Sequence, residues 1–171
     1  MPETSTAKKG LEGVVAASTR ISHVDGQAGR LIIAGYPLEE IAGKATYEEV
    51  SFACWKAGLG QTPALPTKSE YESLTSELAE MRRVPDARIT LVQSAWKTPA
   101  MDAVRMGASV LSLSDSAVED ESVEKNFERA KRLTAQLPVI VAMHDRIRRS
   151  LNLVPPKADL DRASNFLYML N

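Results

Sequence analysis

The longest helical pattern in the sequence limits the fold more than any other feature. It runs from Val123 to about Arg149, and its apolar residues recur at the spacing of one helix face. These residues are Val123, Phe127, Ala130, Leu133, Leu137, Ile140 (or Val141), His144 and Ile147. Pro138 removes one backbone donor inside the segment, so it should bend the helix without ending it. Residues 137–143 are apolar on every side, so the pattern predicts a mainly α fold in which this helix is buried all round near the bend.

Helix-start signals mark the shorter helices on both sides of this segment. Thr46 with Glu49, and Thr67 with Glu70, fit the capping box, in which two side chains satisfy backbone groups of the first turn. The final helix should open at Asp159 or Asp161, near the end of the sequence. The other predicted helical segments are 37–43 with Pro37 at its first position, 46–58, 67–81, 85–96 and 98–114.

The segment 98–114 carries the clearest surface for helix packing. We expect Thr98 to cap this helix and Pro99 to take its first position. Its predicted apolar stripe consists of Met101, Val104, Ala108 and Leu111. Gly107 and Ala108 keep part of that face thin, so that a neighbouring helix can come close.

The N-terminal part predicts a β-hairpin. Two β-branched stretches, 14–21 and 30–34, flank a turn in which Asp25-Gly26 and Gly29 supply the conformations that a tight reversal requires. The expected organisation is a disordered lead-in at 1–9, a β-hairpin segment at 10–36 and a helical part at 37–171.

Composition excludes several classes of protein. The 21 basic and 22 acidic residues give a net charge of −1, which argues against nucleic acid or an anionic membrane as partner. The longest apolar run, residues 139–143, is far shorter than the ~20 residues that span a bilayer. One cysteine rules out an internal disulfide framework, and the polar start lacks a signal peptide's apolar core. We therefore expect a cytoplasmic protein.

Few side chains are candidates for chemistry, and the patterns favour structural roles for them. His23 falls in the predicted turn, where a solvated residue is expected. His144 lies on the helix stripe, where last-turn carbonyls or Asp145 can satisfy it; an active-site role is the alternative. Cys54 sits in an apolar helix, where a thiol is buried and inert. Neither histidine has a partner at metal-ligand spacing.

Three arginines close the long helix and offer a second candidate. Arg146, Arg148 and Arg149 complement the negative end of the helix dipole, which predicts a solvated helix end. The alternative is that they bind the phosphate of an anionic cofactor.

Five blocks of the sequence, taken in order, resemble segments of the citrate synthase family. Residues 10–43 resemble the family's opening, with Gly-Leu-x-Gly, two strands around an Asp-Gly-x-x-Gly turn, and Gly-Tyr-x-Ile/Leu. Residues 46–63 resemble its next helix, which has an aromatic-Glu-Glu-Val start and a Leu-Pro connector. The remaining blocks resemble His-Pro-Met-Asp-x-Leu-Arg-Thr (98–113), Leu-Ile-Ala-Lys-Leu-Pro-x-Ile-x-Ala (129–143) and Asn-Phe-Leu-Tyr-Met-Leu (160–171). The sequence departs from the family pattern at Ala34, where Arg-Gly-Tyr has its arginine, and at Pro99, where His-Pro-Met-Asp has its histidine.

The resemblance implies the large-domain helices of a citrate synthase, with a short N-terminal β-hairpin. Enzymes of this family condense oxaloacetate with acetyl-CoA, using a catalytic histidine and aspartate and further residues that hold oxaloacetate. The family's segments with these residues, such as His-Ala-Asp-His-Glu and Gly-Pro-x-His-Gly-Gly, follow the Asn-Phe-Leu-Tyr-Met block, and none occurs in these 171 residues. We therefore expect the N-terminal part of such an enzyme, inactive alone. We assign it no catalytic, cofactor-binding or metal-binding residue, and acetyl-CoA is the co-substrate of the complete enzyme.

The family resemblance also implies partners. Citrate synthases are homodimers, so we expect a dimer through the helices around 100–112 and 123–147. A separate C-terminal fragment is a second expected partner, because the final apolar run 165–170 looks like a break inside a longer helix. A non-catalytic helical dimerisation module is the alternative. A stand-alone enzyme built on His144 is disfavoured, because no acid–base pair can be assembled. The residues do not distinguish acetyl-CoA from propionyl-CoA.

Overall fold

The computed structural model of the chain describes residues 15, 17–95 and 97–171. Its contacts divide the chain into two compact units, residues 1–66 and 67–171. The lead-in expected at 1–9 lies outside the described residues, and the domain bounds expected from the sequence stay predictions. Within the described part of the chain, no helix has both the length and the apolar character needed to cross a membrane.

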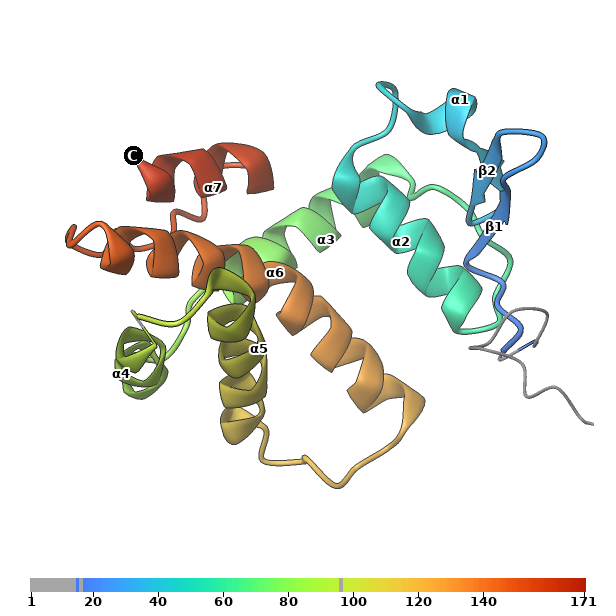
Figure 1. Cartoon of the computed structure of the whole chain (residues 1–171). Coiled ribbons are helices and arrows are strands. Elements are labelled where there is room, and N and C mark those ends of the chain that lie inside the picture. Colours follow the sequence, from blue (N-terminus) through green and yellow to red (C-terminus); the bar gives the residue numbers. More distant parts are fainter. Residues whose placement is uncertain (1–14, 16, 96) are drawn as a thin grey trace, which may run out of the picture. The chain divides into compact units, whose positions relative to one another are not determined.

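The first unit begins with a three-stranded antiparallel sheet in the order β1-β2-β3 (Figure 1). Its strands are β1 Ser22–Asp25, β2 Arg30–Ile33 and β3 Tyr36–Pro37. The predicted hairpin is confirmed, but its first strand comes after the predicted stretch 14–21, of which 14 and 16 are not described. The turn is shorter than predicted because an Asp25 carboxylate oxygen accepts the N–H groups of Gln27 (3.1 Å) and Ala28 (2.9 Å).

This shorter turn corrects two predictions. His23 lies in β1 opposite Ile32 and not in the turn, although it is exposed as expected. Pro37 ends β3 and precedes helix α1, Leu38–Ile41, instead of taking the first helical position. The next helix, α2 (Tyr47–Gly58), starts at the predicted capping box of Thr46 and Glu49, which is confirmed.

The second unit is helical and is arranged around one long helix (Figure 1). Its elements are α3 Lys68–Met81, α4 Asp86–Ser94, α5 Ala100–Leu111, the short 3-10 helix η1 Ser112–Ser114, α6 Val123–Arg148 and α7 Arg162–Leu170. The predicted long helix with an internal proline is α6, and it contacts α3, α4, α5 and α7. The predicted capping box of Thr67 and Glu70 starts α3, and Asp161 is the cap of α7.

Burial in α6 is concentrated after its midpoint. The main cluster of buried apolar residues consists of Val84, Val92, Leu111, Val139, Ile140, Ala142, Met143 and Met169. Val141 is 38% exposed, so the prediction of burial on every side of 137–143 is wrong at this position. The four helices packed on α6 cover the other sides and leave this one open in the described structure.

Buried polar side chains link α6 and α7 to the rest of this unit. Arg82, at the end of α3, donates from Nη1 to the carbonyl oxygens of Lys157 (2.9 Å) and Leu160 (2.6 Å). Gln136 donates from Nε2 to the carbonyl oxygen of Arg83 at 2.8 Å. These bonds hold the connector before α7 and the end of α3 in place, because buried carbonyl groups need a donor.

Helix α5 differs from its prediction in two ways. Thr98 does not cap the helix: its hydroxyl donates to the carbonyl oxygen of Ala95 (2.7 Å), and the N-cap is Pro99, whose side chain makes no capping bond. The buried residues of α5 are Ala103, Gly107, Val110 and Leu111. Met101, predicted in the stripe, is 72% exposed. The buried face is the one that packs on α6, and it is rotated from the predicted stripe.

The thin helix face predicted at Gly107 is present, and helix α6 of the same chain packs against it. A Cβ atom added to Gly107 would lie 2.6 Å from Cγ2 of Ile140, well inside van der Waals contact. The two helices therefore approach closely at this point, and only a residue without a side chain fits.

Candidate functional site

The residues singled out from the sequence do not gather at one place. Cys54 lies in α2 and is half-buried, where the prediction had it buried; burial raises the pKa of its thiol, which favours the protonated form. His23 lies in the sheet of the same unit. Among the residues that the structure describes, no group of three or more histidine, cysteine, aspartate or glutamate side chains could hold a metal ion.

His144 is buried, with 3% of its surface exposed. Asp145, one of its two predicted partners, pairs instead with Arg149 at 2.9 Å. Within the described part of the chain, Nε2 of His144 has no hydrogen-bond partner, so the predicted satisfaction by last-turn carbonyls does not hold for this atom. Neither of the two cavities described below is lined by His144.

The predicted solvated arginine cluster is only partly solvated. Arg148 is exposed, whereas Arg146 is 8% exposed and donates to backbone carbonyl oxygens of Asn152 and of α7. Arg149 also donates to the end of α7. Two of the three guanidinium groups are therefore occupied by the protein's own backbone, which leaves them poorly placed to bind a cofactor phosphate.

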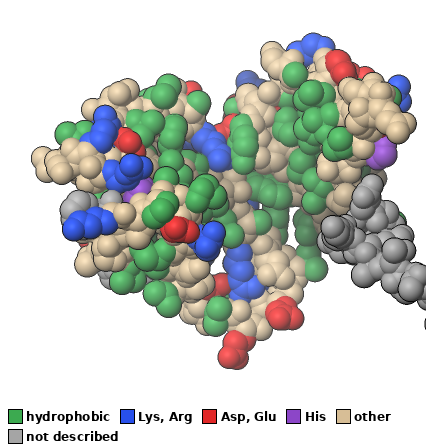
Figure 2. Space-filling model, viewed as in Figure 1, with side chains coloured by type: hydrophobic (Ala, Val, Ile, Leu, Met, Phe, Trp, Pro, Cys, Tyr) green, Lys and Arg blue, Asp and Glu red, His purple; other side chains and the backbone are tan. Residues whose placement is uncertain are grey.

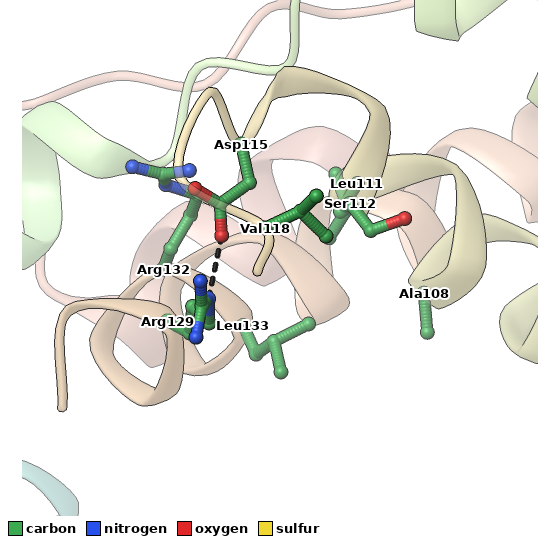
Figure 3. Close-up of a pocket in the computed structure, with 8 residues that line it drawn as sticks. All are labelled: Ala108, Leu111, Ser112, Asp115, Val118, Arg129, Arg132 and Leu133. Carbon is green, nitrogen blue, oxygen red and sulfur yellow. Dashed lines mark hydrogen bonds and ion pairs between the residues drawn. The ribbon is translucent and has the colours of Figure 1, made fainter. Parts of the chain in front are cut away.

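A cavity of about 270 Å³ lies between the end of α5 and the first half of α6 (Figure 3). It is lined by Ala108, Leu111, Ser112, Asp115, Val118, Arg129, Arg132 and Leu133. Asp115 and Arg129 point toward each other at one end, and Ala108 lies at the other (Figure 3). Most of the accessible wall is apolar, and the charged side chains form a rim at one end of the cavity. The cavity therefore fits an apolar group.

Arg129 is the hydrogen-bonding centre of this rim. Its Nε donates to Oδ2 of Asp115 at 2.5 Å, and Nη1 donates to the carbonyl oxygen of Asp120 (2.6 Å) and to Oδ1 of Asn126 (3.0 Å). Nη2 donates to the carbonyl oxygen of Ala117. One guanidinium group thereby orders the acidic loop between η1 and α6. The sequence signal for this was an arginine in the second turn of the helix that follows an acidic loop.

The loop is expected to loosen in acid because of Asp115. The hydrogen bond from Arg129, followed by the N–H group of Ala117, holds the pKa of the Asp115 carboxyl below its usual value. Asp115 therefore stabilises the folded loop above the pKa of an unperturbed aspartate, about 3.9. This stabilisation is lost as the pH falls through the lower pKa that Asp115 has in the folded loop. Amide exchange at Ala117 should accelerate there. Asp115→Asn should weaken this pH dependence, and Asp159→Asn, at an exposed position, should leave it unchanged.

A second cavity, of about 410 Å³, lies beside α4 and the connector 153–156. Its wall is formed by Arg83, Val84, Asp86, Ile89, Val139, Met143, Leu153, Val154, Pro155, Pro156 and Met169. Its charged residues, Arg83 and Asp86, are exposed. Neither cavity is lined by a histidine or a cysteine; each has one carboxylate, Asp115 in the first and Asp86 in the second.

Comparison with known proteins decides the family. The family model described as "Citrate synthase, C-terminal domain" matches residues 10–171, nearly the whole chain. The chain belongs to the citrate synthase family. The predicted citrate synthase-like fold, mainly helical with a small sheet near the N-terminus, is thereby confirmed together with the helices and strands of the structure.

Curated relatives of this citrate synthase-family chain are longer than it is. It is 38% identical to the citrate synthase of Haloferax volcanii, over 96% of this chain and 43% of that protein. It is 35% identical to the 2-methylcitrate synthase of Mycobacterium tuberculosis, over 98% of this chain and 41% of that protein. The chain therefore spans about two-fifths of the length of these relatives.

Solved structures show the same relation. The citrate synthase from Pyrobaculum aerophilum superposes with a TM-score of 0.77 at 34% identity, over 94% of this chain and 41% of that one. The Thermoplasma acidophilum citrate synthase, solved as a ternary complex with carboxymethyl coenzyme A and oxaloacetate, gives a TM-score of 0.82 at 22% identity, with the same coverage. The second likeness supports the fold alone.

Proposed function

We propose that this chain is the helical N-terminal part of a citrate synthase-like acyltransferase and is inactive by itself. The complete enzyme would condense oxaloacetate with acetyl-CoA to give citrate and CoA. The observation that carries the proposal is the family match over residues 10–171, combined with a sequence that lacks the family's catalytic histidine motifs. The order of the five family-like blocks supports an N-terminal position. We place the protein in the cytoplasm.

Two acyl-CoA co-substrates are candidates for the complete enzyme. Relatives of similar identity are named citrate synthase, 2-methylcitrate synthase and citrate/2-methylcitrate synthase. Acetyl-CoA and propionyl-CoA are therefore both tested as co-substrates of an assembled enzyme.

Release of thiol from acetyl-CoA or propionyl-CoA in the presence of oxaloacetate tests this function. The chain alone should release none. Residues 1–171 fused to the part of the Haloferax volcanii enzyme that follows its matching region should restore thiol release. The same part fused to the relative's own matching region is the positive control. Activity of the chain alone would overturn the proposal.

The second candidate function is a non-catalytic helical dimerisation module. It is favoured by large apolar side chains that stay exposed on α5 and α6, among them Met101, Val123, Leu133 and Val141. Apolar side chains also form several patches on the visible face of the helical unit (Figure 2). An inactive fusion beside an active control would support the dimerisation module over the acyltransferase.

Both functions include a homodimer, which we propose to form through α5 and α6. Large apolar surfaces are rarely left open in a protein that acts alone, which supports this assembly. Light scattering at micromolar concentration should give the mass of a dimer or a larger oligomer, and a monodisperse monomer would contradict the proposal. A separate C-terminal fragment is the second partner that we propose, and mixing it with the chain should restore thiol release.

A further inference from the structure

The C-terminal ends of α6 and α7 meet at two arginine side chains. Arg146 donates from Nη1 to the carbonyl oxygens of Met169 (3.5 Å) and Leu170 (3.3 Å). Its Nε donates to the carbonyl oxygen of Asn152, just beyond the end of α6. Arg149 donates from Nη2 to the same Leu170 oxygen at 2.6 Å. We call Arg146 and Arg149 the α7 clamp.

Elementary electrostatics explains why two positively charged side chains are stable side by side at this helix end. The last carbonyl groups of a helix have no partner inside the helix, and the helix dipole makes this end negative. A buried guanidinium group loses its hydration, so it must find several acceptors in the protein. The carbonyl groups at the end of α7 supply acceptors for both arginines, and Asp145 supplies a carboxylate for Arg149.

The two members of the clamp differ in what else they do. Arg146 is nearly buried, so its side chain also fills space between the helices. The Arg149 side chain is 49% exposed, and it reaches the end of α7 from the surface. Its contact with Leu170 therefore contributes little to the core but fixes one specific atom at the end of α7.

We propose that Arg146 and Arg149 are positioning residues, which hold the end of α7 and so set the path of the chain beyond it. This inference rests on the proposed function, in which the family's catalytic segments are reached through this helix. A helix end that moves by a fraction of a turn would displace everything attached to it. Two guanidinium groups that donate to the adjacent carbonyl groups of Met169 and Leu170 restrict that movement more than the single ammonium group of a lysine could.

Hydrogen exchange resolved by residue tests the clamp in the full chain. Arg149→Gln should accelerate exchange at Tyr168 to Asn171 at least tenfold, because the charged donor to Leu170 is lost. Arg149→Lys should restore only part of the protection. Arg148→Gln is the matched control: it removes the same charge from the same helix end, at an exposed residue, and should change nothing. Equal exchange in Arg149→Gln and Arg148→Gln would overturn the clamp.

The fusion protein tests the effect on the reaction. Arg149→Gln in the fusion should lower kcat for thiol release at least threefold, with the KM for acetyl-CoA changed less, while Arg148→Gln keeps the kcat of the parent fusion. If both variants keep that kcat, the clamp does not position the catalytic part, and that half of the inference is wrong. If the parent fusion is inactive, the proposed function fails, and with it the link to catalysis; the exchange experiment still decides whether the clamp holds α7.

Discussion

Replacing Ile140 with alanine is expected to lower the free energy of unfolding of the unit 67–171 by about 3 to 4 kcal/mol. Ile140 is fully buried and belongs to the main apolar cluster around α6. Alanine would remove three carbon atoms and leave a cavity, which the surrounding helices can close only in part. Domains of this size have a total stability of about 5 to 15 kcal/mol, so the loss is a large share of it.

Urea denaturation, monitored through the hydrogen exchange of α6 peptides, measures this loss. Because α6 belongs to the unit 67–171, this readout reports the unfolding of that unit and not of the unit 1–66. The midpoint should fall while the m-value stays constant. Val141→Ala is the matched control, because Val141 is the next residue of the same helix and is 38% exposed. Its cost should stay below about 1 kcal/mol, as for most substitutions outside the core. Similar losses for the two variants would show that Ile140 is not a centre of the packing.

The elements that rest on local rules were predictable from the sequence. The capping boxes at Thr46 and Thr67 form as predicted, since each depends on residues three apart in the chain. The long helix around Pro138 also needed only its own periodicity. The hairpin was predicted in kind, but its first strand lies later in the chain than the β-branched pattern suggested, because it runs to Asp25, whose side chain closes a shorter turn.

Features that depend on tertiary contacts were not predictable in this way. The buried face of α5 is set by which side packs on α6, and the apolar pattern of α5 alone allowed a stripe that includes the exposed Met101. Thr98 illustrates the same limit, because a hydroxyl can either cap the next helix or bond to the preceding turn. Local sequence does not decide between two such bonds of similar energy.

The candidate site shows why residue type is a weak guide to function. The charge of Arg146 and Arg149 suggests an anionic ligand, yet their guanidinium groups donate to carbonyl groups about 20 residues away in sequence. Arg129 received no role from the sequence, although it organises the loop beside a cavity. An arginine can bond to any backbone carbonyl that the fold brings near, and the sequence does not indicate which one.

Gly107→Val is expected to destabilise the same unit by about 3 kcal/mol, at the upper end of typical overpacking costs. Even the first added carbon would lie 2.6 Å from Cγ2 of Ile140, and a β-branched isoleucine has little freedom to rotate away. Gly107→Ala should cost less, because its better helix propensity recovers about 1 kcal/mol. Gly58→Ala, in the unit 1–66, is the control for the same exchange without a clash: its new Cβ would lie 3.7 Å from Cδ1 of Ile21, at ordinary contact distance, and the stability of the unit 67–171 should not change.

The double variant Gly107→Val with Ile140→Ala gives the sharper test of the α5–α6 contact. Ile140→Ala removes the methyl group that the introduced valine would strike, and that valine would fill part of the cavity that the alanine leaves. The two substitutions should therefore cost well below the sum of their separate losses, with a coupling of about 1 to 3 kcal/mol. Urea midpoints of the four proteins measure this coupling. Strict additivity would mean that Gly107 and Ile140 do not meet, and that α5 packs on α6 through a different face.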